Sequence, residues 1–193
     1  LPSSDAGAVV ALAERLELLL SIFAKGERPS GSSDPYALRR AGNGLLQIVW
    51  DRGWRLDLSR FLGSAVEDWA ALFPEFAILS SALHQDLCQL LRQRIVSQLE
   101  DEGFAPDLVQ AVSAESVATE RLLADPMDVR ERLDLLNALR KTRSKYANRV
   151  IRRVMEYCPL DMQMMAVDIA AEIPVRRTVD VLMPILARES AKE

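Results

Sequence analysis

Residue types on which many active sites and scaffolds depend are scarce in this 193-residue chain. It has one histidine and two cysteines, and Cys88 and Cys158 form no C-x-x-C pattern. Neither a zinc site nor a redox motif is therefore indicated, and we expect both thiols to be reduced, in a cytosol-like compartment. No apolar run approaches the roughly 20 residues of a membrane span, and strand-like alternation is almost absent. A disulfide scaffold and a membrane-spanning protein are both disfavoured.

The first residues, Leu1-Pro-Ser-Ser, carry neither the positive charge nor the apolar core of a secretory signal. They also lack an initiator methionine, so we expect the chain to be a fragment of a longer protein. Hydrophobic residues make up 49% of the sequence and aromatic residues 6%. That share is enough for a buried core, and the abundance of Leu, Ala, Arg and Glu favours helices. We predict an all-α fold, an irregular multi-helix array without a fixed-length repeat.

Apolar residues at helical spacing give the expected elements. They predict helices over 5–25, 34–53, from Asp57 or Ser59 to near Pro74, 78–102, about 106–112 and about 115–124. In two places an aspartate precedes a proline, at Asp34-Pro35 and Asp125-Pro126. We expect each aspartate to cap a helix whose first residue is the proline. The second of these helices is expected to be interrupted at 141–144, and a further helix to follow with Tyr146 and Tyr157 on one face.

No catalytic constellation stands out. His84, the lone histidine, has no nucleophile or carboxylate motif near it in sequence, and we interpret it as an ordinary polar helix residue. The glycines of G-N-G at 42–44 lack the third glycine and the preceding strand of a phosphate-binding loop. We interpret them as a place where another helix packs closely. A helical hydrolase would need several metal ligands, which this sequence does not supply.

The distribution of charge is uneven. The formal net charge is −4, yet no acidic residue occurs from Leu135 to Met155. That stretch holds seven basic residues: Arg140, Lys141, Arg143, Lys145, Arg149, Arg152 and Arg153. On a helix the last four fall close to one stripe. Such a face on an acidic protein is typical of a polyanion-binding surface, and the alternative is a solvated face paired with acidic neighbours elsewhere.

Two further pairs of basic residues are ambiguous from their pattern alone. Arg39 and Arg40 follow the first Asp-Pro, and Arg92 and Arg94 lie on the expected long helix. For the first pair, packing or salt bridges are favoured over phosphate contact.

Four segments resemble one family. Residues 34–48, DPYALRRAGNGLLQI, resemble the D-P-F-A-L-R-R-A-A-x-G segment of the β subunit of bacterial-type glycyl-tRNA synthetase. Residues 8–16, 23–35 and 91–112 resemble its A-L-V-A-L-A-D-K-L-D helix, its P-T-G-S-x-D-P loop and its E-G-F-containing helix pair. The resemblance covers about residues 5–155. It departs at Asn148 and Arg152, where the family usually has Lys and Asn, and it cannot be followed beyond about residue 159.

The resemblance implies a fold and a division of labour. Residues 1–60 would be the end of an HD-like helical body, and residues 61–193 a DALR-type anticodon-binding helical bundle, C-terminally truncated or divergent. In that family the α subunit, using ATP and Mg²⁺, activates glycine and aminoacylates the tRNA, and the β subunit mainly recognises tRNA. This fragment would therefore be part of a ligase without a catalytic site or cofactor of its own.

The resemblance also implies partners and site residues. The partners would be tRNA-Gly and the α subunit, in a heterotetramer or a fused chain, with no membrane, in the bacterial cytoplasm or a plastid. The expected tRNA-binding residues are Arg39, Arg40, Arg94, Arg140, Lys141, Arg143, Lys145, Arg149, Arg152 and Arg153. The alternative function is a helical protein-interaction module that binds no nucleic acid.

Overall fold

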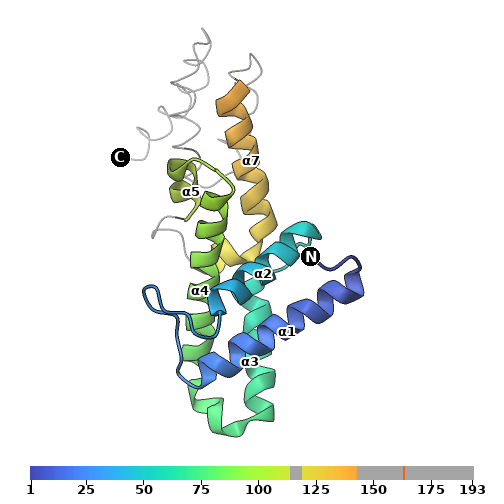
Figure 1. The fold of residues 1–193 in the computed structure, drawn as a ribbon, viewed down its shortest axis with the longest axis vertical. Coiled ribbons are helices and arrows are strands. Elements are labelled where there is room, and N and C mark those ends of the chain that lie inside the picture. Colours follow the sequence, from blue (N-terminus) through green and yellow to red (C-terminus); the bar gives the residue numbers. More distant parts are fainter. Residues whose placement is uncertain (114–118, 143–162, 164–193) are drawn as a thin grey trace, which may run out of the picture. The chain divides into compact units, whose positions relative to one another are not determined.

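The computed structural model describes residues 1–113, 119–142 and Gln163, and its regular elements in that part of the chain are helices (Figure 1). They are α1 (Asp5–Ala24), α2 (Leu38–Asp51), α3 (Leu58–Leu72), the 3-10 helix η1 (Pro74–Leu79), α4 (Ser80–Asp101), α5 (Pro106–Ser113), α6 (Thr119–Ala124) and α7 (Pro126–Thr142). The all-α prediction is confirmed for these residues. Glycines in the left-handed region follow α1, α2 and α4, as the sequence predicted for Gly26 and Gly103.

The chain divides into two compact units. Unit 1 comprises Leu1–Gly103 with Glu115–Arg130, and unit 2 comprises Phe104–Ala114 with Glu131–Glu193. Among the described residues of unit 2, Phe104, Leu108, Val109 and Leu133 are buried. Residue 60, where the family resemblance implies a domain boundary, lies inside α3 in unit 1. The division into an HD-like body and an anticodon-binding domain stays a prediction.

The core of unit 1 is organised around α4, which contacts α1, α2, α3 and α6 (Figure 1). α4 can pack against several helices at once because its apolar residues are not confined to one narrow stripe. The buried apolar side chains of α4 are Leu83, Leu87, Cys88, Leu90, Leu91, Ile95 and Leu99. α3 and α4 are joined through η1 at one end, where Pro74 interrupts the helix, so the two helices run in opposite directions beside each other.

α2 approaches α4 closely at Gly42. A Cβ atom at Gly42 would lie 3.1 Å from Arg94 Cγ and 3.5 Å from Leu91 Cδ2, so a larger residue there would require the Arg94 side chain on α4 to shift by a few tenths of an ångström. Gly44 faces α1 instead, and a Cβ there would overlap the Arg15 guanidinium. The interpretation of this glycine pair as a site of close helix packing is confirmed.

This close approach predicts opposite effects for one substitution at two helical glycines. Gly63 lies in α3, and a Cβ there would meet only His84 at 3.7 Å. Gly63→Ala should raise the free energy of unfolding by about 0.5–1 kcal/mol, because alanine restricts the unfolded chain. Gly42→Ala should lower it, because overpacking costs about 1–3 kcal/mol. Urea denaturation measures both, and an equal gain at the two sites would contradict close packing at Gly42.

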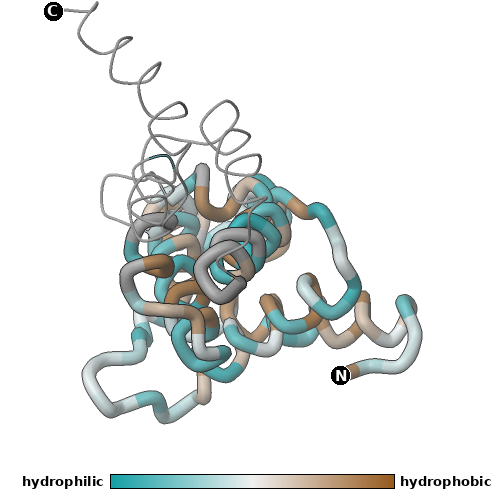
Figure 2. Tube along the Cα trace, turned by 90° about the horizontal axis from the view of Figure 1, so that it is seen from above, coloured by the Kyte–Doolittle hydropathy of each residue, from teal (hydrophilic) through white to brown (hydrophobic). Residues whose placement is uncertain are grey.

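The connection from α1 to α2 is polar and drawn from white to teal in Figure 2, yet it is held at several points. The Arg28 guanidinium donates to Asp86 Oδ2 of α4 through Nη2 at 2.6 Å and lies over the Phe23 ring at 4.3 Å. Arg39 Nη2 donates to the Gly31 carbonyl at 2.8 Å. These contacts fix a segment that buries little apolar surface.

The start of α2 differs from the sequence prediction. Asp34 does accept from the first turn, because its two carboxylate oxygens lie 2.7 Å from Leu38 N and 3.0 Å from Arg39 N. The helix begins at Leu38, however, and Pro35 is not its first residue. The Ala37 N–H donates to the Asp34 carbonyl in a turn, and Ala37 itself is left-handed at φ 56°.

Asp34 should therefore stabilise the folded state, although it lies four residues before the first residue of α2. Asp34→Ala leaves two backbone N–H groups without their acceptor and should lower the free energy of unfolding by about 1–2 kcal/mol. Asp34→Asn keeps one acceptor oxygen and should cost less. Chemical denaturation of both variants tests this, and equal stability of the parent and Asp34→Ala would show that the cap is dispensable.

Candidate nucleic-acid interface

The basic segment begins at the end of α7. Arg140 and Lys141 lie in the last turn of this 17-residue helix. The other five residues of the predicted basic segment lie outside the described part of the chain: Arg143, Lys145, Arg149, Arg152 and Arg153. Their arrangement on one face stays a prediction. Of the expected break at 141–144, α7 includes the first two residues.

The beginning of α7 is anchored in unit 1. Asp125 Oδ1 accepts from Asp128 N at 3.0 Å, so the second Asp-Pro does cap a helix that starts at its proline, as predicted. Asp125 Oδ2 also accepts from Arg55 at 3.0 Å. The Trp50 indole N–H donates to the Pro126 carbonyl at 3.0 Å. These contacts hold the first turn of α7.

A bidentate ion pair lies beside this anchor. Arg130 donates to the two oxygens of Glu102, through Nη1 at 3.1 Å and Nη2 at 2.7 Å. The Arg130 guanidinium also lies 5.1 Å from the centroid of the Trp50 ring. Sequence reasoning missed Trp50, Glu102 and Arg130, because the three are distant in sequence. The only signal in the sequence was the Asp-Pro cap, which identifies the start of α7 but not its partners.

Arg39 and Arg94 lie near each other between α2 and α4. Burial lowers the pKa of Arg94, and the charge of Arg39 lowers it further, whereas Asp101 and Asp34 act in the opposite direction. Arg94 Nε is buried and has no hydrogen-bond partner among the residues that the structure describes. The partial burial of Arg94 between α2 and α4 favours a packing role for this side chain. That Arg39 and Arg94 bind tRNA stays a prediction.

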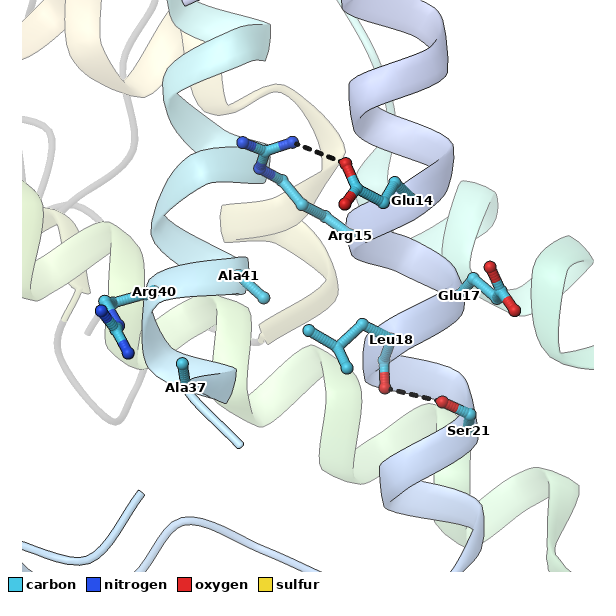
Figure 3. A pocket seen from close by; sticks show the side chains of 8 residues that line it. All are labelled: Glu14, Arg15, Glu17, Leu18, Ser21, Ala37, Arg40 and Ala41. Atoms are coloured by element: carbon cyan, nitrogen blue, oxygen red, sulfur yellow. Dashed lines mark hydrogen bonds and ion pairs between the residues drawn. The ribbon is translucent and has the colours of Figure 1, made fainter. Parts of the chain in front are cut away.

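Arg40 lies apart from this cluster, beside a pocket of about 530 Å³ between α1 and α2 (Figure 3). Arg15 points toward Glu14 across 3.9 Å, whereas the Arg40 side chain extends away from α1 (Figure 3). Arg40 is exposed and has no ion pair among the described residues. The Arg40 guanidinium is therefore available to an external anion, whereas the Arg39 guanidinium already donates to the Gly31 carbonyl.

His84 and Cys88 resemble a catalytic pair in distance but not in hydrogen bonding. His84 Nε2 lies 3.4 Å from Cys88 Sγ and 2.9 Å from the Ser59 carbonyl oxygen. A carbonyl can only accept, so Nε2 carries a hydrogen and donates it to Ser59. The same nitrogen cannot then remove the thiol proton. Burial raises the pKa of the Cys88 thiol, so the arrangement is unsuited to nucleophilic catalysis.

Cys88 should consequently react slowly with alkylating reagents. In a Cys158→Ser chain, iodoacetamide should modify Cys88 far more slowly at about pH 8 than in the urea-unfolded chain, since only the thiolate reacts. The rate should still rise above about pH 8.5, where an ordinary thiol is half ionised, because the pKa is raised. Rapid alkylation near neutral pH would show instead that His84 activates the thiol.

Two further kinds of site, a metal site and a membrane span, can be checked in the residues that the structure describes. There, no three side chains among His, Cys, Asp and Glu are grouped so that they could hold a metal ion. None of the helices in 1–113 and 119–142 is both long and apolar enough to cross a membrane. The expectation that this chain binds no cofactor stays a prediction.

Comparison with known proteins identifies the class and then the family. A family model described as glycyl-tRNA synthetase beta subunit matches residues 1–114. The glycine–tRNA ligase beta subunit of Picosynechococcus sp. is 41% identical over 142 residues, which are 72% of this chain and 19% of the relative. That of Acaryochloris marina is 40% identical over 142 residues, again 72% and 19%. That of Ectopseudomonas mendocina is 36% identical over 141 residues, 73% and 19%.

The matches are to subunits of an aminoacyl-tRNA synthetase. The family model covers more than half of the sequence, so the chain belongs to the glycyl-tRNA synthetase beta subunit family. The chain spans about a fifth of the length of the curated relatives it matches. The family resemblance found in the sequence is confirmed over this region.

Proposed function

We propose that this chain is a tRNA-binding portion of a glycine–tRNA ligase β subunit and serves glycyl-tRNA synthesis without catalysing a step itself. The observation that carries the proposal is the acid-free segment from Leu135 to Met155 with its seven basic residues. In a chain of net charge −4, such a segment attracts a polyanion by releasing the counterions that the phosphates hold. Membership of the family makes tRNA-Gly the expected polyanion.

The arginines of unit 1 differ from those of the acid-free segment in having carboxylate partners. Several arginines there are used to tie one element to another through a carboxylate: Arg28 with Asp86, Arg52 with Asp5, Arg55 with Asp125, and Arg130 with Glu102. In the segment from Leu135 to Met155 the sequence offers no such carboxylate. Its positive charges are therefore the better candidates for an external anion.

The proposed mechanism is positioning. Lysine and arginine side chains of the basic segment contact phosphates of the tRNA and set its orientation, whereas contacts to unpaired bases supply selectivity. A partner α subunit supplies the aminoacylation site, with ATP and Mg²⁺ as its reactant and metal ion. His84 and Cys88 take no part in that chemistry, because their hydrogen bonding does not provide a base for the thiol.

Salt-dependent binding of tRNA tests the proposal. A labelled tRNA-Gly transcript titrated with the chain should bind, and log K should fall with log salt by about 0.7–0.9 for each phosphate contacted. Arg140→Gln with Lys141→Gln should weaken binding and reduce the slope by about 0.7–0.9 for each phosphate that is no longer neutralised.

A matched control removes the same charge elsewhere. Lys25→Gln with Arg60→Gln likewise neutralises two basic residues; Lys25 lies directly after α1, Arg60 lies on α3, and both are exposed. This variant should keep the parent slope. Equal slopes for both double variants, or binding of the parent that does not depend on salt, would refute the basic segment as the RNA-binding surface.

The second candidate, a protein-interaction module, is supported by one feature. Large apolar side chains are exposed at the end of α3 and in η1, with Leu72 73% and Ile78 95% exposed. Apolar surface of this kind is typical of contact sites where it is contiguous. Under this alternative, Ile78→Ser would abolish co-elution of the chain with the recombinant α subunit, and the chain would show no salt-dependent RNA binding.

A further inference from the structure

Tyr36 is an exposed aromatic ring on the polar connection between α1 and α2. It lies two residues before α2 begins, and 45% of its surface is exposed. Residues 25–37 contain no other aromatic residue and no Leu, Ile, Val or Met, whereas Ser30, Ser32 and Ser33 are exposed (Figure 2). The centre of a protein–protein interface is apolar over a wider area than one ring. A single ring among hydroxyl groups and cations is typical instead of a surface on which a nucleic-acid base stacks.

The fold holds the backbone around Tyr36 and leaves its side chain unused. The Ala37 N–H donates to the Asp34 carbonyl at 3.1 Å, and Leu38 N donates to Asp34 Oδ1 at 2.7 Å. These two hydrogen bonds close a turn that contains Tyr36. The Tyr36 side chain itself has no hydrogen bond, ion pair or ring contact with any residue that the structure describes. A ring on a fixed backbone loses little conformational freedom when it binds, which favours affinity.

Arg40 supplies a cation within reach of this ring. Four residues separate it from Tyr36, and four residues span at most about 14 Å. Residues 35–50 contain no acidic residue, and Arg40 is exposed without an ion pair among the described residues. Its side chain extends away from α1, which carries Glu14 and Glu17 (Figure 3). The guanidinium is therefore free for a phosphate close to a base that stacks on Tyr36.

We propose that Tyr36 and Arg40 form a stacking site on unit 1 for an unpaired RNA base. The Tyr36 ring stacks on the base, and the Arg40 guanidinium binds a phosphate of the same strand. The site selects single-stranded parts of the RNA, because the face of a paired base inside a helix is covered by its neighbours. This inference rests on the proposed function, since it takes tRNA-Gly as the ligand, and it adds a contact that lies entirely within unit 1.

Substitutions of Tyr36 test the ring. Tyr36→Ala should weaken binding of the labelled tRNA-Gly transcript by about 5-fold or more, the lower end of what one stacked base contributes. Tyr36→Phe keeps the ring and should bind within about 2-fold of the parent. Tyr36→Leu keeps apolar bulk without a flat ring and should bind nearly as weakly as Tyr36→Ala. Binding by Tyr36→Ala at the parent affinity would overturn the proposal, and so would full rescue by Tyr36→Leu.

A second RNA separates stacking from charge. A blunt-ended RNA duplex offers phosphates but no unpaired base, so at low salt Tyr36→Ala should bind it as the parent does. Arg40→Gln should weaken binding of both RNAs and lower the salt slope by about 0.7–0.9, because one phosphate is no longer neutralised. If Tyr36→Ala loses as much affinity for the duplex as for the transcript, the ring does not act by stacking and the proposal is wrong.

Leu72→Ala is the matched control for the loss of an exposed apolar side chain. Leu72 lies at the end of α3 in unit 1 and is 73% exposed. Its truncation should leave RNA binding at the parent level. The urea midpoint of Tyr36→Ala should also stay at that of the parent, because the side chain makes no contact that the fold needs. Equal losses of RNA binding in Leu72→Ala and Tyr36→Ala would show that the effect is not specific to Tyr36.

The two proposals fail in different ways. If the parent chain does not bind tRNA-Gly in a salt-dependent manner, the proposed function is wrong, and the stacking site with it. If the parent binds and Arg140→Gln with Lys141→Gln weakens binding, whereas Tyr36→Ala does not, the proposed function stands and the stacking site is wrong. If Tyr36→Ala keeps RNA binding but no longer co-elutes with the recombinant α subunit, Tyr36 is a protein contact, which also overturns the stacking site.

Discussion

The close approach of α2 to α4 is the constraint on which unit 1 depends. α4 buries leucines toward several neighbours at once, and helices that share one partner must each come near its axis. Gly42 allows this for α2, because any Cβ there would press against the stem of Arg94. Trp50, two turns further along α2, then meets the start of α7. The packing at Gly42 and the anchoring at Pro126 are consequences of the same helix placement.

The two Asp-Pro sequences show how tertiary context decides a local motif. At Asp125-Pro126 the aspartate caps a helix that starts at the proline. At Asp34-Pro35 the same pair begins a turn, and the helix starts three residues after the proline, following a left-handed alanine. The Asp34 carboxylate reaches the first turn in spite of this. The contacts that hold the preceding segment, among them Arg39 to the Gly31 carbonyl, exist only in the folded unit.

Arginine has two distinct uses along this chain. In unit 1 its planar guanidinium joins segments that are far apart in sequence, as Arg28 does with Asp86 and Arg130 with Glu102. Those arginines are occupied by carboxylates and aromatic faces of the protein. The segment from Leu135 to Met155 is rich in cations but has no acidic residue. The number of acidic residues near an arginine in sequence, and not the net charge of the chain, therefore separates the arginines that stabilise the fold from those that we propose to bind RNA.

Local sequence was sufficient for the helical class, the positions of most helices, the glycine stops and the family, because helical periodicity, caps and family motifs are local properties. It also located Gly42 as a place of close packing. It could not determine that Arg39 and Arg94 lie together with Asp34 and Asp101, or that His84 donates to Ser59 and so cannot serve Cys88. Nor could it pair Glu102 with Arg130 over Trp50. Such residues are distant in sequence, and only the tertiary packing of the helices brings them together.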